Sequence, residues 1–92
     1  MNNEEIEKFL TRQNITDEMP VKIFFKQRAP LSGIFVKGRD FEELKEKNFW
    51  RIVTDTKHAE WLRLKSIDIA RIFNGTEFSK LENKSRAAIK QQ

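Results

Sequence analysis

Short runs in which apolar and polar residues alternate constrain the fold of this chain more than any other feature. The run 21–26, directly after Pro20, places Val21, Ile23 and Phe25 at every second position. That period is typical of a strand with one buried face. Four further runs follow it, at 31–37, 49–54, 61–65 and 67–73. We therefore expect five short strands in an antiparallel sheet.

The first residues of the chain follow a helical period instead. Ile6, Phe9 and Leu10 form one narrow apolar stripe at spacings of three and four residues. The side chain of Asn3 can cap the first turn by accepting a backbone N–H. A helix over residues 3–14 is therefore expected ahead of the strands.

The second expected strand, 31–37, contains Gly33, where the backbone can bulge or approach another strand closely. The stretch Phe41–Lys47 fits two structures. Phe41 and Leu44 are spaced as on a helix, whereas the charged residues around them also suit an exposed hairpin. Five short strands with a sharply bent second strand favour a partly open barrel. We predict a mainly β chain, with an N-terminal helix followed by a five-stranded, strongly bent antiparallel sheet or small barrel.

Ninety-two residues allow one small domain. A small domain buries a limited share of its surface, so its core needs large side chains, which eight Phe and two Trp supply. We expect this domain to span residues 1–83, with Phe78 and Leu81 beginning a short final element. Residues 84–92 form a basic tail, which is either a disordered solubilising end or an arm that catches RNA.

The composition excludes several kinds of site. The chain has no Cys and one His, His58, so disulfides, thiolate or His-based metal sites and a catalytic triad are not expected. The carboxylates cluster with lysines, as in Glu42–Lys47, and there is no Gly-rich phosphate loop. We expect no enzyme activity, no cofactor and no metal. Without a long apolar run or the apolar region of a signal peptide, we expect a soluble, cytoplasmic protein with no membrane partner.

Charge is distributed unevenly along the chain. Residues 1–19 carry two basic and five acidic groups, residues 20–79 carry twelve and eight, and residues 80–92 carry four and one. An acidic start and a basic end can attract each other within a chain or between subunits. The basic part can equally attract polyanions such as RNA.

Three segments resemble the first half of Sm-like proteins, in particular the bacterial RNA-chaperone type: Pro20–Phe25, Leu31–Val36 and Asp40-Phe41. The run Trp61–Ile72 is similar to the second motif of that family, in which a short apolar strand follows an apolar strand that ends in a basic and a small residue. The resemblance spans Glu4–Phe73. It implies an N-terminal helix on a five-stranded bent barrel, assembly of copies into rings through edge strands, and RNA binding on the ring surfaces.

The chain departs from the pattern of that family in three places. Glu42 and Glu43 follow Phe41, where the family has an Asn shortly after the aromatic residue, and Lys65-Ser66 stands where the family has a basic residue and Gly, or Lys-His. The connection between the second and third strands is also longer than in the family. The tripeptide Lys57-His58-Ala59 matches a Lys-His-Ala motif of the bacterial type. It precedes a run expected to be a strand, so we interpret the match as coincidence.

Single-stranded RNA is recognised by bases that stack on aromatic or Arg side chains, with basic groups on the phosphates. One turn offers these groups together, because Phe41 can stack on a base, Asp40 can accept from a base edge and Arg39 can meet a phosphate. Lys65, followed by Ser66, would complete this pocket from a neighbouring strand. A basic patch near the first strand adds phosphate contacts: Lys22, Lys26 and Arg28.

Each candidate residue also has an ordinary structural interpretation. Phe41 can belong to the core with Leu44 beneath it, and Lys65 can be a surface residue. Trp50 and Trp61 are expected in the core rather than in a ligand site. These alternatives stay open at the level of the sequence.

The function predicted from these features is that of an RNA-binding Sm-like protein, an RNA-chaperone or riboregulation-type module. It would contact single-stranded RNA through basic and aromatic side chains and self-associate through edge strands. The alternative is a small barrel that serves as a protein-interaction or assembly module and binds no nucleic acid. In both cases an edge strand such as Val21–Gln27 or Ile67–Phe73 would pair with another chain.

Overall fold

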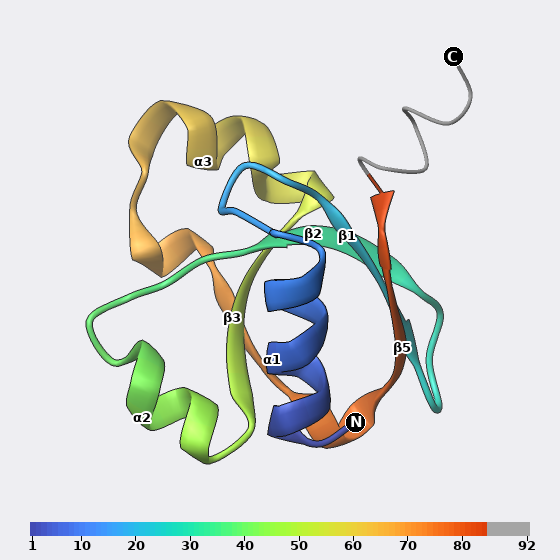
Figure 1. The fold of residues 1–92 in the computed structure, drawn as a ribbon. Helices are drawn as coiled ribbons and strands as arrows, with labels where there is room; N and C mark the ends of the chain where they lie inside the picture. The colour runs from blue at the N-terminus through green and yellow to red at the C-terminus, as the bar shows by residue number, and fades with distance from the viewer. Residues whose placement is uncertain (85–92) are drawn as a thin grey trace.

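The fold begins with a helix and a hairpin, and two further helices interrupt the strands that follow. The computed structural model describes residues 1–84 (Figure 1), so the predicted tail lies outside the described residues apart from Lys84. The helices are α1 (Asn3–Arg12), α2 (Phe41–Glu46) and α3 (His58–Leu64). The strands are β1 (Val21–Phe25), β2 (Leu31–Phe35), β3 (Phe49–Thr54), β4 (Arg71–Asn74) and β5 (Phe78–Asn83). Short 3-10 turns lie between them: η1 (Asp55–Lys57), η2 (Ile67–Ile69) and η3 (Gly75–Glu77).

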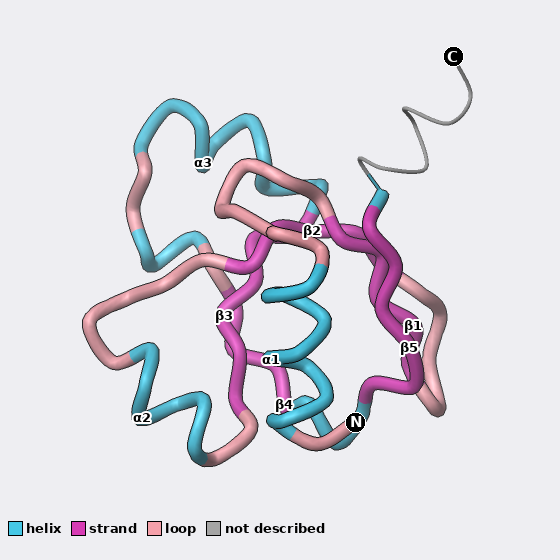
Figure 2. Tube along the Cα trace, viewed as in Figure 1, coloured by secondary structure: helices cyan, strands magenta, loops and turns pink. Residues whose placement is uncertain are grey.

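The strands form one antiparallel sheet in the order β4-β3-β2-β1-β5. β4 and β5 are its two edges, and the sheet is not closed. The predicted N-terminal helix and five-stranded antiparallel sheet are therefore confirmed. The chain is mixed α/β rather than mainly β, because helical segments cover more of residues 1–84 than strands do (Figure 2).

α1 begins with a capping box at Asn2. The Asn2 side-chain oxygen accepts the Glu5 backbone N–H at 2.8 Å, and the Glu5 carboxylate accepts the Asn2 N–H at 3.0 Å. This exchange satisfies donors that the first turn of a helix otherwise leaves unpaired. The prediction that Asn3 caps the helix is wrong, because its side chain faces α2, where its Nδ2 donates to the Lys45 carbonyl oxygen at 3.0 Å.

α1 packs its apolar stripe against one face of the sheet (Figure 1). Ile6 is fully buried there, and Phe9 and Leu10 pack against the same cluster. The sheet and the β4–β5 end of the chain supply its other buried members: Val21, Ile23, Phe25, Phe35, Trp50, Ile52, Phe73, Phe78 and Leu81. The alternation in β1 therefore turns its apolar positions toward α1 and leaves Lys22 and Phe24 on the opposite face.

β2 approaches β3 closely at Gly33, as the sequence predicted. A Cβ at this position would lie 2.6 Å from the carbonyl oxygen of Val53 and 2.7 Å from Cγ2 of Ile52. A side chain here would therefore have to displace the backbone of the neighbouring strand. Glycine lets the two strands stay paired at this point, with Gly33 opposite Thr54.

The segment Trp61–Lys65, predicted as a strand, forms most of α3 and its C-terminal cap. α3 lies on the other face of the sheet, where Trp61 packs with Ile34, Val36 and Val53. The strand prediction was wrong because α3 as a whole contains Ala59, Glu60, Leu62, Arg63 and Leu64, residue types that favour helices. Of its apolar residues, Trp61 is buried, whereas Leu62 and Leu64 are exposed on the helix.

The last two strands also differ from the prediction. Only the second part of the run 67–73 pairs, as β4, and its first part is η2. The fifth strand is instead β5, which pairs with β1 so that Ile23 lies opposite Leu81. β1 therefore lies between β2 and β5, and the prediction that Val21–Gln27 could be a free edge is wrong.

Candidate nucleic-acid interface

Phe24 lies on the face of β1 that points away from α1. It belongs to neither buried cluster. Its ring has two ammonium groups near it, with Nζ of Lys22 at 5.1 Å and Nζ of Lys80 at 5.5 Å from the centroid, within the range of an attractive cation–π contact. Lys80 reaches the ring from β5, where it pairs opposite Phe24, and Figure 2 shows these two strands side by side. We call Lys22, Phe24 and Lys80 the β1–β5 platform.

Two exposed ion pairs involve Lys80 of the platform and Lys84, which follows β5. Lys80 pairs with Glu82 at 3.1 Å, and Lys84 pairs with Asp55 at 3.6 Å. The four side chains are between 46% and 63% exposed, so solvent screens both pairs and they contribute little to stability. Their ammonium groups can therefore exchange these carboxylates for other anions.

The other two members of the predicted basic patch lie in the β1–β2 connection. The guanidinium of Arg28 lies 4.9 Å from the centroid of the Phe25 ring. Lys26 is exposed, and its backbone N–H donates to the Glu77 carbonyl oxygen at 3.0 Å, which joins the hairpin to η3. The predicted patch is thus divided, because Lys22 lies on the outer face of β1 while Lys26 and Arg28 lie beyond its end.

Asp40 forms an ion pair with Arg51 of β3. Its carboxylate accepts from Nη2 at 2.7 Å and from Nε at 3.3 Å, the two-point geometry that makes Arg–carboxylate pairs specific. The hydrogen bond from Arg51 lowers the pKa of Asp40 below its ordinary value of 3.8. Asp40 therefore anchors the turn before α2 to the sheet, and a base edge would compete with Arg51 for it.

Phe41 is shared between the core and the surface. Its ring meets Trp50 edge-on with the centroids 6.1 Å apart, and it packs against the cluster beneath α1. Nζ of Lys37 and Nζ of Lys45 lie 4.9 and 5.6 Å from its centroid. Arg39, the predicted phosphate contact, is exposed beside it in the chain. Phe41 thus combines the core role with the cationic surroundings expected of a base-stacking residue.

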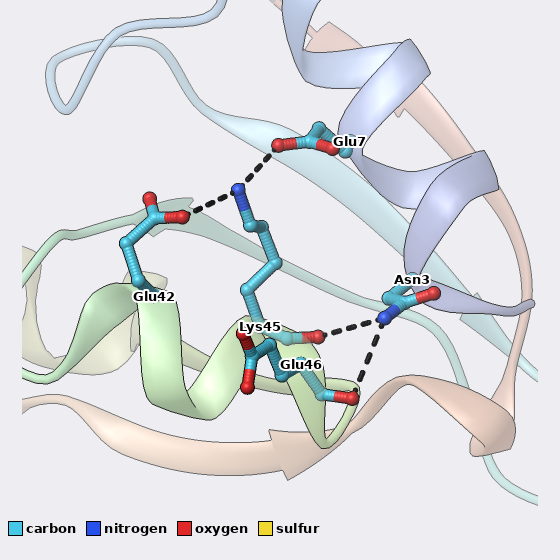
Figure 3. Close-up of polar contacts among 5 residues, drawn as sticks. All are labelled: Asn3, Glu7, Glu42, Lys45 and Glu46. Atoms are coloured by element: carbon cyan, nitrogen blue, oxygen red, sulfur yellow. Dashed lines mark hydrogen bonds and ion pairs between the residues drawn. The ribbon is translucent and has the colours of Figure 1, made fainter.

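Lys45 joins α2 to α1 (Figure 3). Its ammonium pairs with Glu7 at 2.6 Å and with Glu42 at 2.8 Å. Hydrogen bonds with Glu42 and then Glu7 raise the pKa of Lys45 to about 12. Asn3 crosses the same seam, donating to the carbonyl oxygens of Lys45 at 3.0 Å and Glu46 at 3.5 Å. Since α2 has no fully buried residue, these polar contacts help to hold it in place.

A hollow of about 680 Å³ lies between α1, α2 and β2. Its charged lining consists of three carboxylates and two ammonium groups: Glu7, Asp17, Glu42, Lys37 and Lys45. Its large apolar lining residues are Leu10, Ile15, Phe35, Phe41 and Trp50. Its volume falls within the range of ligand pockets. Lys45 already pairs with Glu7 and Glu42, so Asp17 is the carboxylate of this lining that has no ion pair within residues 1–84. The lining thus carries one more carboxylate than ammonium group.

Lys65 ends α3 in the left-handed conformation, with a φ of 51°. Its ammonium lies 5.3 Å from the centroid of the Trp61 ring, and the hydroxyl of the following Ser66 accepts a backbone N–H of η2 at 3.4 Å. The structure does bring η2 next to the turn before α2, because a Cβ on Gly38 would lie 3.6 Å from Cγ1 of Ile67. This contact joins η2 to the turn before α2, whereas the Lys65 ammonium lies over Trp61 of α3.

Sequence reasoning missed the pairing of Phe24 with Lys80. One signal for Phe24 was present, because it is a large aromatic residue on the lysine-bearing face of the run 21–26. No local signal placed Lys80 beside it, since that neighbour depends on β5 pairing with β1 across more than fifty residues of chain.

Comparison of the chain with protein-family models, curated proteins and solved structures finds no match. Within residues 1–84, no group of three or more His, Asp or Glu side chains is placed to hold a metal ion. None of the helices in this part of the chain is long and apolar enough to cross a membrane.

Proposed function

We propose that this chain is an Sm-like protein that binds single-stranded RNA through the β1–β5 platform. The observation that carries the proposal is the Phe24 ring, which lies outside both buried clusters with the ammonium groups of Lys22 and Lys80 at 5.1 and 5.5 Å. A base can stack on an aromatic face, while ammonium groups on either side contact the flanking phosphates. The platform offers both kinds of group on one surface.

The Sm-like part of the proposal is supported by the order of elements. An N-terminal helix precedes a five-stranded antiparallel sheet, and the second strand contains the close approach at Gly33. The segments Pro20–Phe25 and Leu31–Val36, which carry the resemblance to that family, form β1 and β2. In that family copies join through edge strands. We therefore propose that the free edges β4 and β5 of neighbouring copies pair, which would complete the barrel-like arrangement.

The test is a titration of labelled single-stranded A-rich and U-rich RNA with purified protein at two salt concentrations. A binder of this kind should show saturable affinity that falls as salt rises, because each phosphate contact releases a counterion. Binding should persist near physiological ionic strength, since stacking on Phe24 does not depend on salt. Binding that modest salt abolishes would show only that the chain is basic, and the proposal would fail.

A protein-interaction module without a nucleic-acid ligand is the second candidate. Three large apolar side chains favour it, because Leu62 and Leu64 of α3 and Ile72 of β4 are 56%, 55% and 51% exposed. Absence of RNA binding together with self-association that Ile72→Ser weakens would favour this candidate over the RNA-binding one.

A further inference from the structure

Acidic and basic residues are distributed unevenly between segments of this chain. Residues 1–19 and 37–47, which include α1 and α2, carry nine acidic and six basic groups. The other residues up to Lys84 carry five acidic and ten basic groups. The seam between α1 and α2 is thus acidic in a protein whose net charge is +4, and Figure 3 shows Glu7, Glu42 and Glu46 along this seam.

The hollow at this seam has accessible carboxylates. Glu42 lines it with its side chain 75% exposed, and its carboxylate shares the Lys45 ammonium with Glu7. Asp17 is also exposed, and its carboxylate has no ion pair within residues 1–84. Leu10, Ile15 and Phe41 provide the apolar part of the lining and are each only partly buried. Lys37 and Lys45 also line the hollow, so its three carboxylates exceed its ammonium groups by one. An occupant complementary to the apolar lining and to Asp17 has an apolar or aromatic centre with positive charge beside it.

The β1–β5 platform of a second copy has this composition. Phe24 is a partly exposed ring with the ammonium groups of Lys22 and Lys80 over it, and Lys80 also pairs with Glu82. Within one molecule the platform cannot reach the hollow, because Phe24 lies on the face of β1 opposite to α1. The two surfaces are therefore placed for contact between different copies.

We propose that the α1–α2 hollow of one copy receives the β1–β5 platform of another. Phe24 would contact the apolar lining, and Lys22 and Lys80 would pair with Asp17 and Glu42. Copies of charge +4 repel each other at long range, so the local pairing of opposite charges must exceed this repulsion for the contact to form at low salt. The contact is head-to-tail, since different surfaces meet. If the RNA-binding function proposed above holds, RNA and this self-contact compete for Phe24; the self-association itself does not depend on that function.

The test uses sedimentation velocity without RNA at 20 and 300 mM salt. The wild-type chain should self-associate at low salt and dissociate at high salt. A platform variant, Lys22→Glu with Lys80→Glu, and a hollow variant, Asp17→Lys with Glu42→Lys, should each self-associate at least tenfold more weakly. An equimolar mixture of the two variants should associate again, because every hollow then meets a platform of opposite charge. A control variant, Lys57→Glu with Arg63→Glu, carries the same charge change as the platform variant and should associate like wild type.

Other results would overturn the proposal. A wild-type chain that stays monomeric at high micromolar concentration and low salt has no such contact. Association that charge reversal leaves unchanged would assign the interface to the edge strands β4 and β5. Failure of the mixture to associate, with both variants folded by circular dichroism, would also exclude it. Binding of RNA is measured separately, so loss of RNA binding in the platform variant alone would bear on the proposed function and not on self-association.

Discussion

The indole Nε1 of Trp50 donates a hydrogen bond to the side-chain oxygen of Asn48 at 2.8 Å in the protein interior. The same Asn48 amide donates from Nδ2 to the Met1 carbonyl oxygen at 2.9 Å, and its backbone oxygen accepts from Gly75 at 2.8 Å. Asn48 thus connects β3 with the N-terminal residue and with the β4–β5 connection. Its own φ of 64° also lets the chain turn from α2 into β3.

Replacement of Asn48 by Ala should therefore lower the free energy of unfolding. The Trp50 indole would lose its partner in a buried site, and an unsatisfied buried group costs about 1–3 kcal/mol. Ala also adopts positive φ less readily than Asn, which adds to the effect. Urea unfolding followed by Trp fluorescence measures the change, with the exposed Gln27→Ala as a control. Equal stability of the Asn48 and Gln27 variants would show that the network contributes nothing.

Gly33→Ala should destabilise the sheet, whereas Gly38→Ala should be tolerated. At Gly33 the added Cβ meets the Val53 carbonyl oxygen at 2.6 Å, and overpacking of this kind costs about 1–3 kcal/mol. At Gly38 the nearest atom is Oδ1 of Asp40 at 3.1 Å, a side-chain atom of the ion pair with Arg51 that has to move by only a few tenths of an ångström. Thermal unfolding of the two variants compares them directly. The steric account fails if both variants melt at the same temperature.

Phe24→Ala should weaken RNA binding without unfolding the protein. Stacking of a base on an aromatic side chain is worth about 1–3 kcal/mol, which corresponds to a loss of roughly ten- to a hundredfold in affinity. Phe24→Trp should keep the affinity, and Phe24→Leu should lose it, because only the first retains an aromatic face. Fluorescence anisotropy with labelled RNA measures these affinities. An unaffected Leu variant would mean that Phe24 provides bulk rather than stacking.

Phe41→Ala separates the two interpretations of that residue. Loss of the edge contact with Trp50 should lower the free energy of unfolding by about 2–4 kcal/mol if Phe41 acts mainly in the core. A folded variant that keeps its stability and loses RNA affinity would instead support the base-stacking role first predicted from the sequence. Parallel urea and RNA titrations distinguish these outcomes.

The Asp40–Arg51 ion pair should make stability depend on pH in the acid range. Because the pKa of Asp40 is lowered in the folded state, its contribution is present above the ordinary value of 3.8 and is lost as pH falls through the folded-state pKa. Asp40→Asn should therefore be less stable than wild type at pH 7, and the difference should shrink as the pH falls below 3.8. Urea midpoints at pH 7 and pH 3 test this, with Asp17→Asn as a control. A difference that is constant with pH would exclude the ion pair as its cause.

The pattern of neighbouring residues was sufficient to predict the helix α1 and the strands β1, β2 and β3. The spacing of Ile6, Phe9 and Leu10 predicts the buried face of α1, and the alternation after Pro20 predicts the buried face of β1. The structure places both faces in the core. Gly33 was recognised for the same reason, because a strand interior rarely contains glycine without a close neighbour. In these segments local propensity and the final fold agree.

The tertiary structure alone decided the remaining elements and the candidate site. The pattern of the segment around Trp61 is compatible with both a strand and a short helix. Which of the two forms depends on the apolar surface of Ile34 and Val53, against which Trp61 packs. β5 is a strand because β1 has a free edge beside it, and only this pairing brings Lys80 to Phe24. Local sequence cannot encode which distant segment supplies a neighbour, since that choice is made by the total surface buried when the sheet assembles.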